Sequence, residues 1–252
     1  MPTPGQVPTQ GPRSALAVAR DNTRFAFDFL RRRWRRLLLV FVGVLLPLWG
    51  FGELAEDLRA GEVFFFDAPL LQFVHTLARV GPDRFFVQIS ALGYGWGVVP
   101  ADIGLVFTLA FRRRSSEGLF AGVAIVGSAL LNLGAKQLFA RDRPTLWESI
   151  APESTFSFPS GHALGSMTLA SVLVLLAWHT RWRWPVTVVA SAFVLLVGLS
   201  RVYLGVHYPS DILAGWTAAL VWTVGTYALV FHDRRPWKAQ SDGPHPAGEQ
   251  GP

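Results

Sequence analysis

The chain has 252 residues, of which 51% are apolar and ten are tryptophan, and its mean hydropathy is +0.33. This length suits one or two soluble domains, but the composition favours a single polytopic membrane domain. Cysteine is absent, which excludes disulfides, thiolate metal sites and thiol nucleophiles. The formal net charge of +6 is compatible with nucleic-acid binding, yet the positions of the charges favour a membrane instead.

The N-terminal region divides into a tail and a basic segment. Residues 1–13, rich in proline, glycine and glutamine, predict a disordered tail with no cleavable signal peptide. Residues 14–36 mix apolar and aromatic side chains with seven arginines, which predicts an amphipathic helix on an anionic lipid surface. A nucleic-acid-binding arm is the alternative for this segment. At the other end, residues 233–252 return to charged and polar residues and predict a cytoplasmic tail.

Six apolar segments predict transmembrane helices, some of which need their flanking residues to reach the length of a span. They are residues 37–51, 85–111, 118–138, 163–178, 186–199 and 212–230. Between the first two, residues 53–82 carry charges and an apolar face at helical spacing, which predicts an extracytoplasmic interfacial helix. The predicted fold is therefore all-α, a six-span membrane bundle within residues 37–232.

The basic residues are distributed unequally about these six spans. Of the 23 lysines and arginines, 16 fall on the side that holds both termini, and seven fall on the other side. Because cytoplasmic loops carry an excess of positive charge, both termini are predicted to be cytoplasmic, in a protein of the inner (plasma) membrane.

Two polar segments share the predicted extracytoplasmic side, residues 136–162 and residues 200–211. They contain Lys136, Arg143 and Arg201, with Arg141 as a fourth cation nearby. Cations concentrated where the topology rule disfavours them indicate an anionic ligand, and a phosphate group fits best. Lysine occurs only twice in the chain, so Lys136 mildly favours a point-charge contact with phosphate.

The same two segments contain a predicted helix cap and a predicted oriented histidine. Ser160 can cap the fourth span, and Gly161 would let an anion approach the free N–H groups at the positive end of that helix. Taken alone, the adjacent His162 could be incidental, but the neighbouring cations favour a place in the site. If a helix begins at Pro209, Asp211 on its first turn can reach back to the His207 imidazole.

These residues together resemble the three-part signature of the type-2 phosphatidic acid phosphatase family, whose site is shared with vanadium haloperoxidases and some soluble acid phosphatases. All signature positions are matched, over about residues 136–211, and the six-span membrane branch of the family resembles about residues 35–232. The three parts are Lys136-x6-Arg143-Pro144, Pro159-Ser160-Gly161-His162 and Ser200-Arg201-x5-His207-x3-Asp211.

The resemblance implies a role for each matched residue. His207 would attack phosphorus and form a phosphohistidine, while Asp211 holds its other ring nitrogen. His162 would protonate the leaving oxygen and then activate water. No metal or other cofactor is implied. The phosphoryl oxygens would be held by Lys136, Arg143, Ser160, Gly161 and Arg201.

The expected function is that of an integral membrane lipid phosphatase acting on undecaprenyl diphosphate or on a broad range of lipid phosphates. The enzymatic alternatives are a phosphatidylglycerophosphate or phosphatidic acid phosphatase, a lipid phosphotransferase on the same site, and a haloperoxidase. An inactive lipid-binding protein is the non-enzymatic alternative. The expected partners are a lipid phosphate substrate and membrane lipids, with no nucleic acid, and the sequence carries no signal for an oligomeric state.

Overall fold

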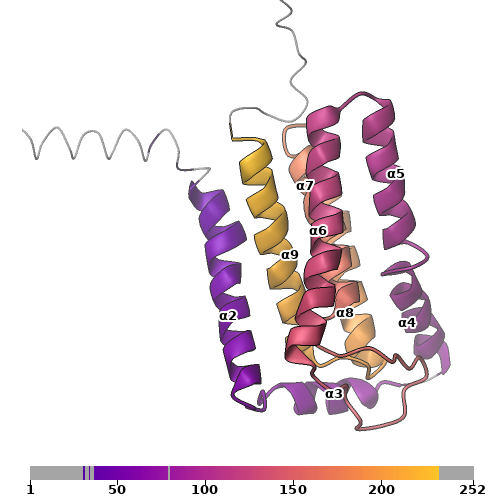
Figure 1. The fold of residues 1–252 in the computed structure, drawn as a ribbon. Helices are drawn as coiled ribbons and strands as arrows, with labels where there is room; N and C mark the ends of the chain where they lie inside the picture. Colours follow the sequence, from indigo (N-terminus) through magenta and orange to yellow (C-terminus); the bar gives the residue numbers. More distant parts are fainter. Residues whose placement is uncertain (1–30, 32–33, 35–36, 79, 233–252) are drawn as a thin grey trace, which may run out of the picture. The chain divides into compact units, whose positions relative to one another are not determined.

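The structure is a computed structural model that describes residues 31, 34, 37–78 and 80–232 (Figure 1). Apart from residues 31 and 34, the predicted basic helix of residues 14–36 lies outside this described part, as do the predicted tails of residues 1–13 and 233–252. The chain divides into two compact units, residues 1–39 and residues 40–252. In the first unit residues 37–39 are helical, and the second unit contains the fold described below.

The described part of the second unit is built from helices and contains no strand. A π-helical turn η1 (Phe41–Leu45) runs directly into α2 (Leu46–Arg59). In Figure 1, α3 lies across the lower ends of the long helices, which stand side by side above it. The remaining helices are α3 (Asp67–His75), α4 (Val80–Leu92), α5 (Val98–Phe111), α6 (Ser115–Phe139), α7 (Gly161–Ala177), α8 (Arg183–Tyr203) and α9 (Pro209–Val230).

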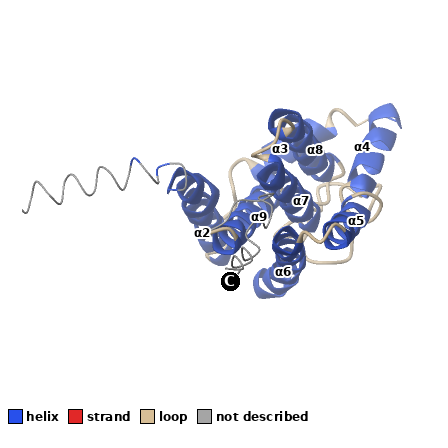
Figure 2. Ribbon diagram, turned by 90° about the horizontal axis from the view of Figure 1, so that it is seen from above, coloured by secondary structure: helices blue, strands red, loops and turns tan. Residues whose placement is uncertain are grey.

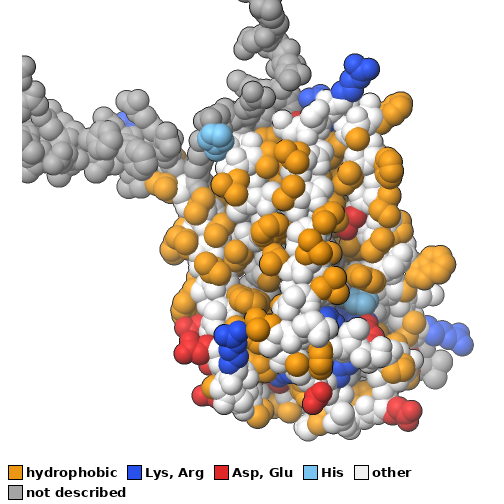
Figure 3. All heavy atoms as spheres, viewed as in Figure 1, with side chains coloured by type: hydrophobic (Ala, Val, Ile, Leu, Met, Phe, Trp, Pro, Cys, Tyr) orange, Lys and Arg blue, Asp and Glu red, His pale blue; other side chains and the backbone are white. Residues whose placement is uncertain are grey.

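Four helical segments in the described residues are long and apolar enough to cross a membrane: Leu37–Arg59, α6, α8 and α9. Helices α5 and α7 are apolar but have only 14 and 17 residues. Large apolar side chains remain exposed along the bundle, and Figure 3 shows them spread over the middle of one face while charged side chains gather at its lower end. This surface is that of a multi-pass membrane protein. The six-span arrangement stays a prediction.

The second predicted span, residues 85–111, is two helices rather than one. Helix α4 ends at Leu92 and α5 begins at Val98, with a tight turn between them. At Gly97 an added Cβ would lie 2.2 Å from the Leu92 carbonyl oxygen, so the chain can pass this close to the end of α4 only with glycine. Gly93 packs closely on Val197 of α8, where a Cβ would lie 2.7 Å from a side-chain methyl. The break therefore has local steric causes.

Helix α7 lies at the centre of the bundle, surrounded by α5, α6, α8 and α9 (Figure 2). Small residues allow α9 to approach its N-terminus closely: a Cβ added to Gly215 would lie 2.8 Å from the Ser160 carbonyl oxygen. The Ser160 N–H donates to the Asp211 carbonyl oxygen at 3.1 Å. This close contact brings the starts of α7 and α9 together.

Helix α3 falls within residues 53–82, where an interfacial helix was predicted. Its apolar residues Leu71 and Val74 are buried in a cluster with Tyr203 and Leu204 at the end of α8. The helix therefore packs across the ends of α8 and α9. Its position at a membrane surface stays a prediction.

Candidate active site

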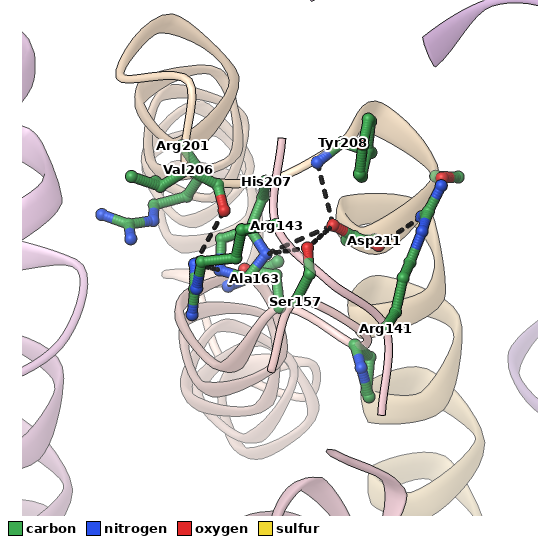
Figure 4. A network of polar contacts seen from close by, with 12 residues as sticks. Arg141, Arg143, Ser157, Ala163, Arg201, Val206, His207, Tyr208 and Asp211 are labelled. Atoms are coloured by element: carbon green, nitrogen blue, oxygen red, sulfur yellow. Dashed lines mark hydrogen bonds and ion pairs between the residues drawn. The ribbon is translucent and has the colours of Figure 1, made fainter. Parts of the chain in front are cut away.

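Polar residues gather where α6 and α8 end and α7 and α9 begin, and the loop of residues 140–160 crosses the same region (Figure 4). The structure brings the predicted catalytic and phosphate-binding residues to this one end of the bundle. They come from α6 (Lys136), the loop (Arg143, Ser160), α7 (Gly161, His162), α8 (Arg201), the α8–α9 turn (His207) and α9 (Asp211).

The His207 imidazole is fully buried and its Nδ1 lies 3.4 Å from Asp211 Oδ2. Helix α9 begins at Pro209, as predicted, so Asp211 lies on its first turn and also accepts the Tyr208 N–H at 2.8 Å. Ser157 Oγ donates to the same carboxylate oxygen (Figure 4). The carboxylate is therefore fixed by the backbone and by a hydroxyl, and it fixes the histidine ring in turn.

The other ring nitrogen of His207, Nε2, lies 3.1 Å from Arg143 Nη1. A guanidinium can only donate, so this contact favours the tautomer with the proton on Nδ1 and a lone pair on Nε2. Burial lowers the pKa of His207 to about 4, although the hydrogen bond with Asp211 acts in the opposite direction. At neutral pH the imidazole is therefore uncharged, and its Nε2 is available as a nucleophile.

Two arginines converge on the Glu153 carboxylate beside this histidine. Arg201, which is 1% exposed, donates to Glu153 Oε1 and to Ser90 Oγ. Arg143 Nη2 donates to Glu153 Oε2 at 2.7 Å. Burial raises the pKa of Glu153, but Arg201, His207 and Arg143 outweigh it and bring the pKa to about 2. The arginines thus hold an ionised carboxylate.

His162 and His207 flank that carboxylate. His162 Nδ1 lies 3.8 Å from Glu153 Oε1, and His207 Nε2 lies 3.9 Å from Glu153 Oε2. The His162 ring also lies beside Tyr94, with 5.2 Å between ring centroids. An anion held by the two arginines is therefore close to one imidazole on each side.

Lys136 joins the site through the loop. Its Nζ donates to Thr155 Oγ1 at 2.8 Å and to the Phe156 carbonyl at 2.6 Å, while Arg143 donates to the Thr155 carbonyl at 2.7 Å. Burial lowers the pKa of Arg143, and the negative charges of Glu153 and Asp211 act against this. The two cations are thus linked by one loop residue.

Ser160 is fully buried at the N-cap of α7, and its Oγ accepts the Ala163 N–H at 3.4 Å. The predicted cap is therefore confirmed. Gly161 packs against Asn132, where an added Cβ would lie 3.1 Å from the amide oxygen. Asn132 in turn donates to the Pro159 carbonyl at 3.2 Å. These contacts fix the start of α7 against α6.

Sequence reasoning missed two functional residues of the loop. Glu153 carried no signal that set it apart from Asp142 and Glu148, the other acidic residues of the same segment. Ser157 carried none, because its contact with Asp211 spans 54 residues. Among the described residues no group of three or more His, Cys, Asp or Glu side chains could hold a metal ion. Metal independence of any reaction stays a prediction.

The fold and the site together define a class: a helical multi-pass membrane protein with a buried histidine–carboxylate pair beside an arginine-lined anion site. A family model described as PAP2 superfamily matches residues 117–235. The chain is 31% identical over 144 residues to phosphatidylglycerophosphatase B of Bacillus subtilis, which covers 55% of this chain and 70% of that protein. It is 36% identical over 175 residues to a decaprenylphosphoryl-5-phosphoribose phosphatase of Mycobacterium tuberculosis. These residues cover 68% of this chain and 91% of that protein.

A third relative is an undecaprenyl-diphosphatase of Sulfolobus acidocaldarius, 34% identical over 156 residues that cover 60% of this chain and 72% of the relative. The crystal structure of a transmembrane PAP2-type phosphatidylglycerolphosphate phosphatase from Bacillus subtilis is similar, with a TM-score of 0.64 and 25% identity over 73% of this chain and 94% of that chain. The crystal structure of Aquifex aeolicus LpxE shares the fold, with a TM-score of 0.55 and 23% identity. The match covers 65% of this chain and 96% of that chain. The chain belongs to the PAP2 superfamily, the type-2 phosphatidic acid phosphatase family.

Proposed function

We propose that the protein is an integral membrane phosphatase that hydrolyses a phosphate or diphosphate monoester of a lipid. The observation that carries this proposal is the unprotonated Nε2 of a buried, neutral His207, which lies 3.9 Å from an anion that two arginines hold. A phosphoryl group in the place of that carboxylate would meet a nucleophile on one side and a proton donor on the other.

In the proposed reaction the phosphoryl group replaces Glu153 between Arg143 and Arg201, with Lys136 as a further cation. His207 Nε2 attacks the terminal phosphorus, and the bond breaks between that phosphorus and the oxygen that links it to the lipid alcohol or, in a diphosphate, to the inner phosphate. His162 gives a proton to that leaving oxygen; because burial lowers the pKa of His162 to about 3, the ring must first take up that proton, from solvent or from the phosphate group, as the substrate binds beside it. The ionised Asp211 stabilises the positive charge that develops on the His207 ring, and the arginines stabilise the phosphoryl oxygens.

In the second step a water molecule attacks the phosphohistidine. His162, now neutral, accepts a proton from that water, the bond between phosphorus and Nε2 breaks, and inorganic phosphate leaves. Ser160 and Gly161 support both steps by holding the N-terminus of α7, whose free N–H groups and dipole favour an anion. An alcohol in place of water would make the protein a phosphotransferase.

A lipid is the substrate class that the surroundings favour. The helices that surround the site expose large apolar side chains, so a phosphate can lie at the mouth of the bundle while its hydrocarbon chains stay in the bilayer. The relatives named above are phosphatases of polyprenyl and glycerol lipids. We favour undecaprenyl diphosphate or a broad range of lipid phosphates, with phosphatidylglycerophosphate and phosphatidic acid as the alternatives.

Phosphate release by the purified protein in detergent tests this proposal. The panel should contain a polyprenyl diphosphate, phosphatidylglycerophosphate and phosphatidic acid, each with EDTA and without an alcohol acceptor. We expect release of inorganic phosphate, its loss in His207→Ala, and its retention in the control His179→Ala, whose exposed histidine lies at the other end of α7. Absence of phosphate release from every lipid by the parent protein would refute the proposal. A need for a divalent metal would refute the metal-free mechanism.

We further propose that the site faces the extracytoplasmic side of the plasma membrane and that both termini are cytoplasmic. The chain has no cysteine, so a single introduced cysteine reports on topology. Ser154 is exposed and lies beside the site, whereas its neighbour Thr155 bonds Lys136 and Arg143 and should be left intact. Ser154→Cys in intact cells should react with an impermeant thiol reagent. Labelling only after lysis would reverse the proposed orientation.

A further inference from the structure

Arg141 bridges two buried carboxylates behind the histidine. Its Nη1 donates to Asp211 Oδ1 at 2.5 Å, and its Nη2 donates to Asp67 Oδ2 at 2.9 Å. The guanidinium also stacks on Tyr208, with 4.1 Å to the ring centroid. The two carboxylate oxygens of Asp211 therefore have different partners: Oδ1 contacts Arg141, and Oδ2 contacts His207.

Asp67 is 2% exposed and lies on the first turn of α3, outside the residues that the family model matches. Besides Arg141 it accepts the backbone N–H of Ser210 at 2.9 Å and the Ser210 hydroxyl at 2.5 Å. Arg141 also donates to the Ser210 hydroxyl at 2.8 Å. A buried carboxylate with three donors, one of them a guanidinium, is fixed in place, and it fixes both the arginine and the start of α9.

We propose that Asp67 and Arg141 form a positioning pair for the reaction, acting through Asp211 on His207; this inference rests on the function proposed above. The four side chains alternate in charge, with Asp67 negative, Arg141 positive, Asp211 negative, and the His207 ring positive once it has attacked phosphorus. Arg141 alone would hold Asp211 in place, but its positive charge would also weaken the stabilisation that the Asp211 carboxylate gives to the His207 ring. Asp67 offsets that effect because it shares the guanidinium.

This arrangement separates two roles within the site. Arg143 and Arg201 face the anion, whereas Arg141 bonds the far oxygen of Asp211. A change at Asp67 or Arg141 should therefore slow the chemical step and leave phosphate affinity unchanged. If Asp67 had a purely structural role and only held α3 against α9, its loss would loosen the whole site. Both the rate of the chemical step and the affinity for phosphate would then decrease.

The test compares Asp67→Asn, Arg141→Gln, Arg141→Lys and the double variant Asp67→Asn/Arg141→Gln in the full chain. For each variant, kcat and KM are measured on the lipid phosphate that the parent hydrolyses, and the affinity for inorganic phosphate is measured by competitive inhibition and by calorimetry. Asp83→Asn is the matched control, because Asp83 accepts a hydrogen bond from Tyr203 at 2.7 Å at the same end of the bundle but makes no contact with Asp211 or His207.

We expect Asp67→Asn and Arg141→Lys to lower kcat about 10- to 100-fold, as loss of an outer partner commonly does. Phosphate affinity should stay within about twofold, so that the loss is in kcat alone. The double variant should lose no more than the worse single variant, because the two residues act as one unit. Asp83→Asn should keep the parent kcat.

Three results would overturn the inference: an unchanged kcat in Asp67→Asn, a parallel loss of phosphate affinity, or losses that multiply in the double variant. If Asp67→Asn does not fold, Arg141→Lys decides, since a lysine keeps the charge but cannot bridge both carboxylates in the same geometry. Failure of the proposed function looks different, because the parent protein itself would then release no phosphate.

Discussion

Glu153 occupies the position in which a phosphate group is proposed to bind, and this leads to the sharpest prediction for the site. Its carboxylate bonds both Arg143 and Arg201, and it lies 3.9 Å from His207 Nε2. Reacting atoms must approach to about 3–3.5 Å, so a phosphoryl group cannot reach His207 while the carboxylate stays. Glu153→Gln removes the competing negative charge and keeps the size of the side chain.

The magnitude follows from the bonds that an entering phosphate must displace. A hydrogen bond between charged partners contributes about 1.5–3 kcal/mol, and Glu153 makes one to each arginine. The side chain is 28% exposed and is hydrated again once displaced, so we take the net cost of displacement as about 1–2 kcal/mol. Glu153→Gln should therefore bind inorganic phosphate about 5- to 30-fold more tightly than the parent.

The assay is inhibition by inorganic phosphate of the parent, of Glu153→Gln and of Glu148→Gln, supported by calorimetric titration of phosphate into each protein. Glu148 is an exposed residue of the same loop, so Glu148→Gln makes the same change in net charge away from the site. We expect a lower inhibition constant only for Glu153→Gln. Equal affinities in all three proteins, or weaker binding in Glu153→Gln, would show that Glu153 does not compete with phosphate.

Four further predictions concern protonation and packing. The pKa of His207 is lowered to about 4, so the acid limb of kcat/KM should lie near pH 4, and a limb near pH 6.5 would contradict this. Between pH 6.5 and 4 the unfolded chain binds a proton that native His207 does not. The contribution of this group to the free energy of unfolding therefore decreases as the pH is lowered from 6.5 to 4, which melting temperatures measured over this pH range can test. His162→Ala should lose lipid phosphatase activity yet retain more on an aryl phosphate, whose leaving group needs little protonation; equal losses on both would argue against the acid role. Gly205 has φ +69° and a Cβ there would lie 2.6 Å from the Trp147 ring, so Gly205→Ala should lower the free energy of unfolding by about 1–3 kcal/mol, and an unchanged melting temperature would refute the strain argument.

Much of the fold could be predicted from the distribution of apolar residues, because each long helix contains one apolar run bounded by charges or turns. The predicted segment of residues 118–138 lies within α6, and the segment of residues 212–230 lies within α9. The break between α4 and α5 could not be predicted this way. Glycines are tolerated in membrane helices, and the contacts that decide the break, at Gly97 and Gly93, appear only in three dimensions.

In the site, too, some contacts could be predicted from the sequence and others depend on the three-dimensional packing. The short motifs located His207 and Asp211 together, because the four-residue spacing across a helix start determines their contact. Glu153 and Asp67 could not be assigned from sequence. The position of Glu153 depends on the path of the loop of residues 140–160, and Asp67 meets Ser210 across 143 residues because α3 packs over the ends of other helices.

The close contact of α9 with the start of α7 has a consequence for biosynthesis. Until α9 is inserted, the Ser160 N–H lacks the Asp211 carbonyl and Arg141 lacks the Asp211 carboxylate. The earlier helices therefore cannot form a competent site before α9 has been synthesised and inserted. Catalytic competence should arise only after α9 has entered the bilayer, which would keep chains that lack this helix from acting on membrane lipids.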